Sequence, residues 1–170
     1  MKKILLVSLV ILVSAISLFA AKYVVGTSAD FPPFEYVQNG EFMGFDIDLI
    51  KAIAAEMGFE IEIRDMSFDS LIAALVSGNL DIVISGMTIT AERAEVVSFS
   101  KPYWTADQSV VVREDSDLTV TVLFGKHSIG VQTGTTGDIW VEDNLVTTKI
   151  LTGDFKRYET YTLAMTDLIN

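Results

Sequence analysis

Five consecutive segments of the chain alternate between the two-residue period of a β-strand and the 3.6-residue period of an α-helix. They are a strand at 22–28, a helix at 45–58, a strand at 59–65, a helix at 67–78 and a strand at 80–85. Parallel strands need a crossover connection, and a helix supplies one. This half of the chain therefore predicts an α/β fold built on a parallel sheet.

Residues at the expected helix ends agree with this interpretation. Asp46 is a candidate N-cap for the first helix, and Gly58 is a candidate stop. Ser67 or Asp69 can cap the second helix, which Gly78 then ends. Both helices are therefore expected to have defined boundaries.

A second alternation begins near residue 110, after a run of β-branched residues. Its expected elements are a strand at 127–133, a Gly-rich turn, a helix at 138–145, a short strand at 149–151 and a helix at 158–170. Two α/β units in one chain predict two lobes, at 22–109 and 110–170.

Residues 1–21 have the pattern of a secretory signal peptide. Two lysines precede an apolar run from Ile4 to Leu12, and two alanines close the segment. The alternative is a permanent N-terminal anchor. In both cases the rest of the chain is expected to be exported, to the periplasm or another extracytoplasmic space.

The composition excludes several classes of function. The chain has 23 acidic residues against 12 basic ones, and its formal net charge of −11 argues against a nucleic-acid partner, which needs a basic surface. It has no cysteine and a single histidine, His127. Zinc clusters and Ser-His-Asp catalysis therefore have almost no material, and neither a metal nor a cofactor is expected.

Four segments are expected where strands end. Open parallel sheets bind ligands beyond the carboxyl ends of their strands. Segments 27–35, 65–70 and 85–93 reach this edge in the first lobe, and 132–138 reaches it in the second. Together they offer hydroxyl, aromatic and acidic side chains and one arginine, and they favour a binding site.

Arg93 suggests what this site binds. A guanidinium forks to a carboxylate through two parallel hydrogen bonds. Thr88 offers a hydroxyl and Gly86 a closely approaching backbone, while Thr135 and Thr136 begin a helix whose free N–H groups favour an anion. The combination suits a free carboxylate flanked by an amine.

The same residues also have simpler interpretations. Arg93 can pair with Glu92 or Glu95 on an exposed surface. Phe31 and Phe68 can provide apolar or cation–π walls for a ligand side chain, but isolated aromatic residues more often belong to the core.

Six motifs of this chain resemble one known family. They are ADFPPFE, GFDIDLIKAIA, DMSFDSLIAAL, GNLDIVISGMTITAER, FSKPY and IGVQTGTTG. Their order and spacing are similar to those of the type-3 solute-binding proteins of polar amino-acid ABC transporters, above all the arginine-, lysine- and histidine-binding members. The resemblance implies a two-lobed type II periplasmic-binding-protein fold that closes over one amino acid.

The resemblance also implies roles for individual residues. Arg93 would grip the ligand α-carboxylate together with the backbone amides of Thr88 and Thr136. The Gly86 carbonyl and the Thr88 hydroxyl would meet the α-ammonium. The residues expected around the ligand side chain are Phe31 and Phe68 as a sandwich, with Ser28, Asp30 and Glu35 near its polar end.

The sequence departs from the family pattern in two ways. Members usually carry an ammonium-binding aspartate on a strand after the helix that here reaches Asn170, and the chain looks like roughly the first two-thirds of a member. Gly86 stands where some members have serine.

The sequence thus predicts a non-enzymatic exported receptor, a monomer or dimer, that delivers a cationic amino acid, arginine first, to an ABC transporter permease. One alternative is a dehydratase-like or lytic transglycosylase-like enzyme that uses Glu35 or Asp30. Another is the sensor domain of a membrane receptor.

Overall fold

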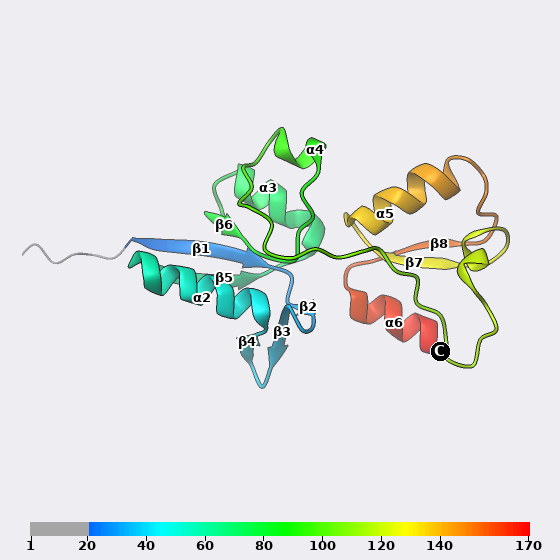
Figure 1. Cartoon of the computed structure of the whole chain (residues 1–170), viewed down its shortest axis with the longest axis horizontal. Coiled ribbons are helices and arrows are strands. Elements are labelled where there is room, and N and C mark those ends of the chain that lie inside the picture. Colours follow the sequence, from blue (N-terminus) through cyan, green and yellow to red (C-terminus); the bar gives the residue numbers. More distant parts are fainter. Residues whose placement is uncertain (1–20) are drawn as a thin grey trace, which may run out of the picture.

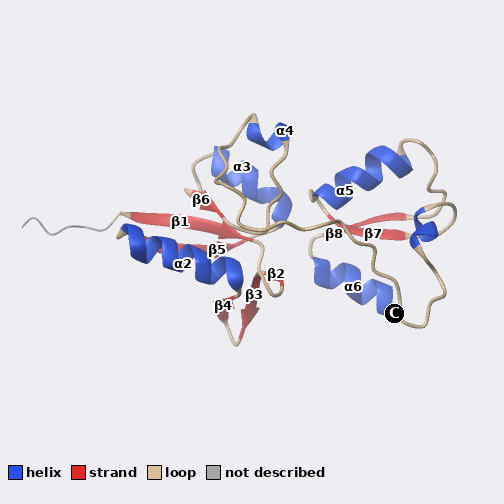
Figure 2. Ribbon diagram, viewed as in Figure 1, coloured by secondary structure: helices blue, strands red, loops and turns tan. Residues whose placement is uncertain are grey.

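The structure is a computed structural model that describes residues 21–170 (Figure 1). The predicted signal peptide at 1–21 lies outside the described residues except for Ala21. Helices and strands gather in two groups that a long loop connects (Figure 2). We call the elements from β1 (Lys22–Thr27) to α4 (Ala91–Ala94) the first lobe and those from η2 (Val120–Leu123) to α6 (Tyr161–Ile169) the second lobe.

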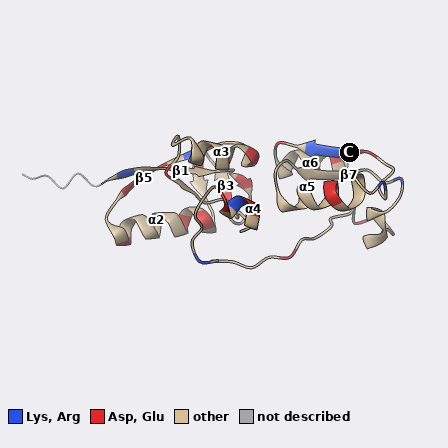
Figure 3. Ribbon diagram, turned by 90° about the horizontal axis from the view of Figure 1, so that it is seen from above, with Lys and Arg blue, Asp and Glu red and all other residues tan. Residues whose placement is uncertain are grey.

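A parallel sheet of three strands forms the centre of the first lobe, in the order β5-β1-β6. Two helices cross over between these strands, and in Figure 3 the sheet lies between them. The bounds are β1 (Lys22–Thr27), α2 (Phe45–Met57), β5 (Glu60–Asp65), α3 (Leu71–Val76) and β6 (Ile82–Val83). The predicted alternation and the parallel sheet are confirmed, although β6 is shorter than the expected strand at 80–85.

The core of the first lobe forms where α2 meets the sheet. Val25, Ile50 and Ile84 form one buried cluster, against which Ile61 and Ile63 of β5 pack. Burial of such side chains stabilises the lobe by about 1.5–3 kcal/mol each. Their alternation along the strands is the pattern that made this lobe predictable.

The N-terminal ends of both helices differ from the prediction. The N-cap of α2 is Gly44, and Asp46 lies inside the first turn, where its carboxylate accepts hydrogen bonds from elsewhere in the fold. The 3-10 turn η1 (Phe68–Ser70) precedes α3, and Ser67 caps it without a side-chain hydrogen bond to the backbone. Asp46 and Ser67 are therefore not side-chain caps. The Asp46 carboxylate bonds to distant residues, and the Ser67 hydroxyl bonds to the Ser70 hydroxyl.

An antiparallel ribbon that the sequence analysis missed lies within the first crossover. It consists of β2 (Asp30–Phe31), β3 (Glu35–Gln38) and β4 (Glu41–Met43). Asn39 and Gly40, at φ values of 55° and 82°, close the turn between β3 and β4. Asn-Gly at such a position is a strong hairpin signal.

Two parallel strands form the sheet of the second lobe, β7 (Ile129–Gln132) and β8 (Phe155–Tyr158). Its other elements are the 3-10 helix η2 (Val120–Leu123), α5 (Thr136–Val141), the π-helical η3 (Glu142–Val146) and α6 (Tyr161–Ile169). Leu123, Val131, Val141, Leu145 and Leu151 form its core. The run of β-branched residues before this lobe lies in the loop between α4 (Ala91–Ala94) and η2.

The predicted strand at 149–151 is wrong. Leu151 is buried and makes only an isolated bridge to Gly125, while the true strand, β8, comes four residues later. Lys149 has a φ of 60°, which a strand does not accommodate. Tyr158 belongs to β8, so the last helix starts after Thr160 instead of at the predicted residue 158.

Acidic residues are spread over both lobes (Figure 3). Across residues 21–170, no group of three or more histidine, aspartate and glutamate side chains is placed to hold a metal ion. Within that same span, no helix has both the length and the apolar character needed to cross a membrane.

Candidate functional site

The two lobes meet where the strands of each sheet end. Asp30, the first residue of β2, accepts hydrogen bonds from two groups of the second lobe, the Tyr161 N–H at 2.7 Å and the Gln132 side-chain amide at 3.4 Å. Gln108, in the connecting loop, donates to the Thr136 hydroxyl at 2.9 Å. Two of the four segments that the sequence placed at strand ends, 27–35 and 132–138, take part in these contacts.

Arg93 also joins the lobes. Its Nη1 donates to the Thr88 carbonyl at 2.7 Å, and its Nη2 donates to the Gly134 carbonyl of the second lobe at 2.9 Å. Arg93 is only 7% exposed, and this burial lowers the pKa of its guanidinium from the ordinary value. An arginine remains charged despite such a shift, so a buried positive charge lies between the lobes.

The simpler interpretation of Arg93 as an exposed surface residue is therefore wrong. Over the described residues, no ion pair links it to Glu92 or Glu95. Thr90 is the N-cap of α4, and its hydroxyl accepts the Arg93 N–H at 3.1 Å. The short helix thus fixes the backbone from which the guanidinium reaches across.

The second lobe faces Arg93 with a tight turn at the end of β7. Gly134 has a φ of 77°, a conformation that favours glycine, and Thr135 follows as the N-cap of α5. The Thr135 hydroxyl accepts the Asp138 N–H at 3.2 Å and donates to the Gln132 carbonyl at 2.9 Å. The sequence expected Thr135 and Thr136 to begin a helix; Thr135 is its N-cap and Thr136 its first helical residue, so α5 starts two residues before the predicted range of 138–145.

The two phenylalanines expected to sandwich a ligand contact different partners. Phe31 stacks on Phe34 and on Tyr161, with ring centroids 5.8 and 5.1 Å apart. Phe68 lies beside Arg93, whose guanidinium carbon is 5.6 Å from its ring centroid. Neither ring belongs to the buried core clusters. Phe31 is thus an aromatic wall at the contact between the lobes, and Phe68 supports the arginine.

Two acidic residues, Glu35 and Asp46, lie behind this contact. Glu35 is 1% exposed, and its Oε1 accepts the Ser85 hydroxyl at 2.9 Å. Desolvation by burial, with the negative charge of Asp46 beside it, raises the pKa of Glu35 to about 9. Glu35 is therefore protonated at neutral pH, and its hydroxyl can donate to Asp46, whose Oδ1 has no other partner in the described part of the chain.

Gly86 and Ser28 lie next to these carboxyls. The Gly86 N–H donates to Asp46 Oδ2 at 2.8 Å, and the Tyr103 hydroxyl donates to the same oxygen at 2.7 Å. The Ser28 hydroxyl donates to Asp30 Oδ1 at 3.2 Å. Ser28 is buried, whereas Gly86 and Thr88 are exposed. The predicted residues thus form one neighbourhood with a buried acidic floor.

Sequence reasoning gave no site role to five residues that contribute to this arrangement, namely Asp46, Tyr103, Gln132, Asp138 and Tyr161. Asp46 and Tyr161 were assigned to helix ends and helix faces, where their spacing fits equally well. Gln132 and Asp138 lie in a segment that was expected at the strand edge, but nothing local distinguishes them from solvated polar residues.

Comparisons with known proteins agree with the geometry. Residues 23–167 match the family described as bacterial extracellular solute-binding proteins, family 3. The arginine-binding extracellular protein ArtP of Bacillus subtilis (strain 168) is 48% identical over 114 residues, which are 66% of this chain and 44% of that protein. The ABC transporter arginine-binding protein 1 of Escherichia coli (strain K12) is 39% identical over 171 residues, covering 100% of this chain and 68% of that one.

A solved structure supports the fold. The structure of holo ArgBP from T. maritima is similar with a TM-score of 0.78 and 47% identity, over 88% of this chain and 65% of that chain. The predicted two-lobed α/β fold of the periplasmic binding proteins is thereby confirmed. The chain spans less than half of the length of ArtP and about two thirds of the length of the other two proteins.

Proposed function

This chain belongs to the bacterial extracellular solute-binding proteins of family 3, and we propose that it is a receptor that holds a cationic L-amino acid, arginine first, between its two lobes. The receptor delivers this ligand to the permease of an ABC transporter. The observation that supports the proposal most is the buried guanidinium of Arg93 at the contact between the lobes.

Arg93 binds the α-carboxylate in this proposal. A guanidinium has five N–H donors, and the carbonyls of Thr88 and Gly134 use two of them. The remaining donors can fork to a carboxylate, which strengthens the interaction because both partners are charged. The backbone amides of Thr88 and Thr136 complete the carboxylate site from the two lobes, with Thr135 as the cap that holds the second one.

The α-ammonium meets the Gly86 carbonyl and the Thr88 hydroxyl. Gly86 is fixed by the hydrogen bond from its N–H to Asp46, and its φ of 53° suits glycine. A Cβ added at Gly86 would lie at ordinary contact distance from Phe31, 3.9 Å, so the positive φ and not crowding is what favours glycine here.

The charge around Phe31 favours a cationic side chain. Phe31 and Tyr161 present aromatic faces, to which guanidinium and ammonium groups are attracted. Asp30 adds a negative charge on the same side, and Ser28 and the protonated Glu35 add polar groups behind it. Phe68 acts from the other side by holding Arg93.

Lobe closure is the proposed mechanism. The carboxylate contacts come from both lobes and coexist only when the lobes are together. A ligand that binds this state better than an open one shifts the population toward it. The permease can then distinguish a loaded receptor from an empty one by its shape.

An enzyme on the same scaffold is the second candidate. It would use Glu35 or Asp30 as the acid, and the raised pKa of Glu35 is the observation that favours it. Glu35 is buried, however, and Asp30 is held by Tyr161 and Gln132, so neither carboxyl is free to reach a substrate. A receptor retains its ligand unchanged, whereas an enzyme releases a product.

Export and assembly complete the proposal. Residues 1–21 direct the chain out of the cytoplasm as a signal peptide, and the receptor works as a monomer or dimer in the extracytoplasmic space. A ligand-sensing domain of a membrane receptor would bind the same amino acid without a permease.

Native mass spectrometry of the exported, purified protein tests the proposal. A receptor that closes over its ligand retains it, so we expect a bound species heavier by the mass of arginine. Incubation with arginine should leave the amino acid chemically intact. A chain that converts the amino acid would favour the enzyme, and a chain that retains and binds none would overturn the receptor.

A further inference from the structure

Gly134 is held from both sides. Its carbonyl accepts from Arg93 Nη2 at 2.9 Å, and its N–H donates to Asp138 Oδ2 at 2.9 Å. A side chain at this position would approach the Asp69 Cβ to 2.9 Å, so the turn also packs closely against the first lobe. The placement of this one residue therefore decides where the second lobe meets Arg93.

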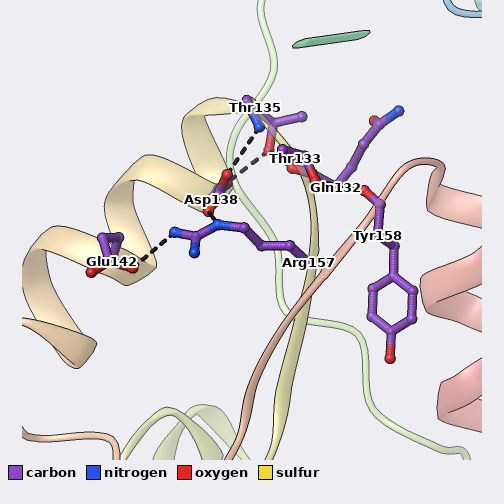
Figure 4. Close-up of polar contacts among 8 residues, drawn as sticks. Gln132, Thr133, Thr135, Asp138, Glu142, Arg157 and Tyr158 are labelled. Carbon is purple, nitrogen blue, oxygen red and sulfur yellow. Dashed lines mark hydrogen bonds and ion pairs between the residues drawn. The ribbon is translucent and has the colours of Figure 1, made fainter. Parts of the chain in front are cut away.

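Asp138 is itself fixed by the neighbouring strand. It lies in α5 and is 6% exposed, and its second oxygen, Oδ1, accepts from Arg157 Nε of β8 at 2.8 Å (Figure 4). A buried carboxylate is stable when it is paired and hydrogen-bonded. Asp138 meets this condition through Arg157 on one side and the Gly134 N–H on the other.

Arg157 has a second, exposed partner on the same helix. Its Nη2 donates to Glu142 at 2.8 Å, where the carboxylate is 39% exposed (Figure 4). Its guanidinium carbon lies 4.4 Å from the centroid of the Phe155 ring. The strand β8 thus holds a guanidinium in place, and only one of its two carboxylate partners touches the turn that faces Arg93.

We propose that Asp138 and Arg157 are positioning residues for the α-carboxylate of the ligand. They hold the turn around Gly134 so that its carbonyl orients Arg93 and the Thr136 amide faces the same point. This inference rests on the proposed function, because it assigns the Arg93 side of the crevice to the ligand carboxylate. Neither Asp138 nor Arg157 touches the ligand in this account.

The inference predicts an effect that depends on the ligand carboxylate. Asp138→Asn keeps the shape of the side chain but removes its charge, which weakens its bonds to Arg157 and to the Gly134 N–H. The turn then loses its fixed orientation. A ligand with a carboxylate suffers from this loss, whereas one whose carboxylate is replaced by a neutral amide has little to lose.

The test compares the affinities of the exported protein for L-arginine and for L-argininamide. We expect the parent to prefer arginine, and Asp138→Asn to weaken arginine binding about tenfold, as the loss of a charged hydrogen bond does. Binding of argininamide should change by less than about twofold. The matched control is Glu142→Gln, which removes the exposed partner of Arg157 and should alter neither affinity by more than about twofold.

A second variant covers the case in which Asp138→Asn does not fold. Arg157→Lys keeps the charge at a side chain that is 42% exposed, but one ammonium cannot replace the rigid guanidinium that bonds Asp138 through Nε and Glu142 through Nη2, so it should also lower the preference for arginine over argininamide. An unchanged preference in both folded variants would overturn the inference and leave the receptor proposal intact. A parent that binds neither ligand would overturn both.

Discussion

Arg93 places a positive charge at the contact between the two lobes of an otherwise acidic chain. The guanidinium is buried, and its known partners are two backbone carbonyls, one from each lobe. A carboxylate is the natural partner for its remaining donors. We therefore propose that the identity of this single residue determines whether a free amino acid binds.

Replacement of Arg93 by lysine tests this role. Arg93→Lys should lower the affinity for L-arginine by about 2–3 kcal/mol, because a point charge cannot replace a bidentate pair. Calorimetric titration measures the change. Arg64→Lys is the matched control, since Arg64 is an exposed arginine paired with Glu62, and it should leave binding unchanged. Parent-like affinity in Arg93→Lys would remove Arg93 from the site.

A second prediction concerns Glu35 and the pH dependence of the free energy of unfolding. Its pKa is raised to about 9 in the folded protein, from an ordinary value of 4.5. The folded state therefore holds a proton that the unfolded chain has lost between these values. The stabilisation from Glu35 is full below about pH 4.5 and is lost as the pH rises toward 9, with a slope of at most about 1.4 kcal/mol per pH unit.

Urea unfolding at pH 5 and pH 8 measures this effect. The parent should lose stability over this interval relative to Glu35→Gln, which cannot titrate. Glu62→Gln is the control, because hydrogen bonds from Lys22 and Arg64 lower the pKa of Glu62 and it does not titrate in this range. The same pH dependence in the parent and in Glu35→Gln would show that Glu35 is ionised throughout.

The elements of the first lobe could be predicted because each has one consistent period. Apolar residues such as Val25 and Ile50 recur with the spacing of a strand or a helix and are buried as that spacing requires. The sequence analysis missed the ribbon from β2 to β4 because its strands are short and mostly exposed. The sequence Asn39-Gly40, which is typical of a hairpin turn, was a signal that could have revealed it.

The elements of the second lobe were harder to predict. The segment before Leu151 looked like a strand, but only Leu151 is buried and it lies in a loop, and β8 uses the polar sequence at Phe155–Tyr158 instead. The site had the same limitation. Arg93 and Thr135 carry local signals, whereas Asp138 and Tyr161 acquire their roles only through contacts with distant residues. The boundary between the lobes near residue 110 stays a prediction.

The turn between β7 and α5 allows a test at the scale of elements. Gly134→Ala should reduce both the free energy of unfolding and the affinity for arginine, because the new methyl group meets Asp69 and displaces the turn. Gly40→Ala is a matched control. Gly40 also has a positive φ of 82°, but nothing lies within 4 Å of the added atom. It should cost about 1 kcal/mol of stability and leave the affinity unchanged, and equal affinities in both variants would contradict the role of the turn.

At the scale of the whole molecule, the contacts between the lobes report closure. The Tyr161 N–H donates to Asp30 across the lobes at 2.7 Å, whereas the Ala29 N–H donates to Asp65 within the first lobe at 2.9 Å. Arginine should slow hydrogen exchange at the Tyr161 amide and leave exchange at the Ala29 amide unchanged. Opening of the lobes breaks the hydrogen bond of the Tyr161 amide but not that of the Ala29 amide. Equal responses of the two amides would argue against closure by ligand.

Calorimetric titration of the exported protein with L-arginine and, separately, with L-glutamate tests the proposed receptor function. We expect one saturable site for arginine and an affinity for glutamate at least about tenfold weaker, because a negative side chain would face Asp30 and lack a cation. A preference for glutamate would contradict the cationic specificity. The absence of binding by any amino acid would contradict the receptor itself.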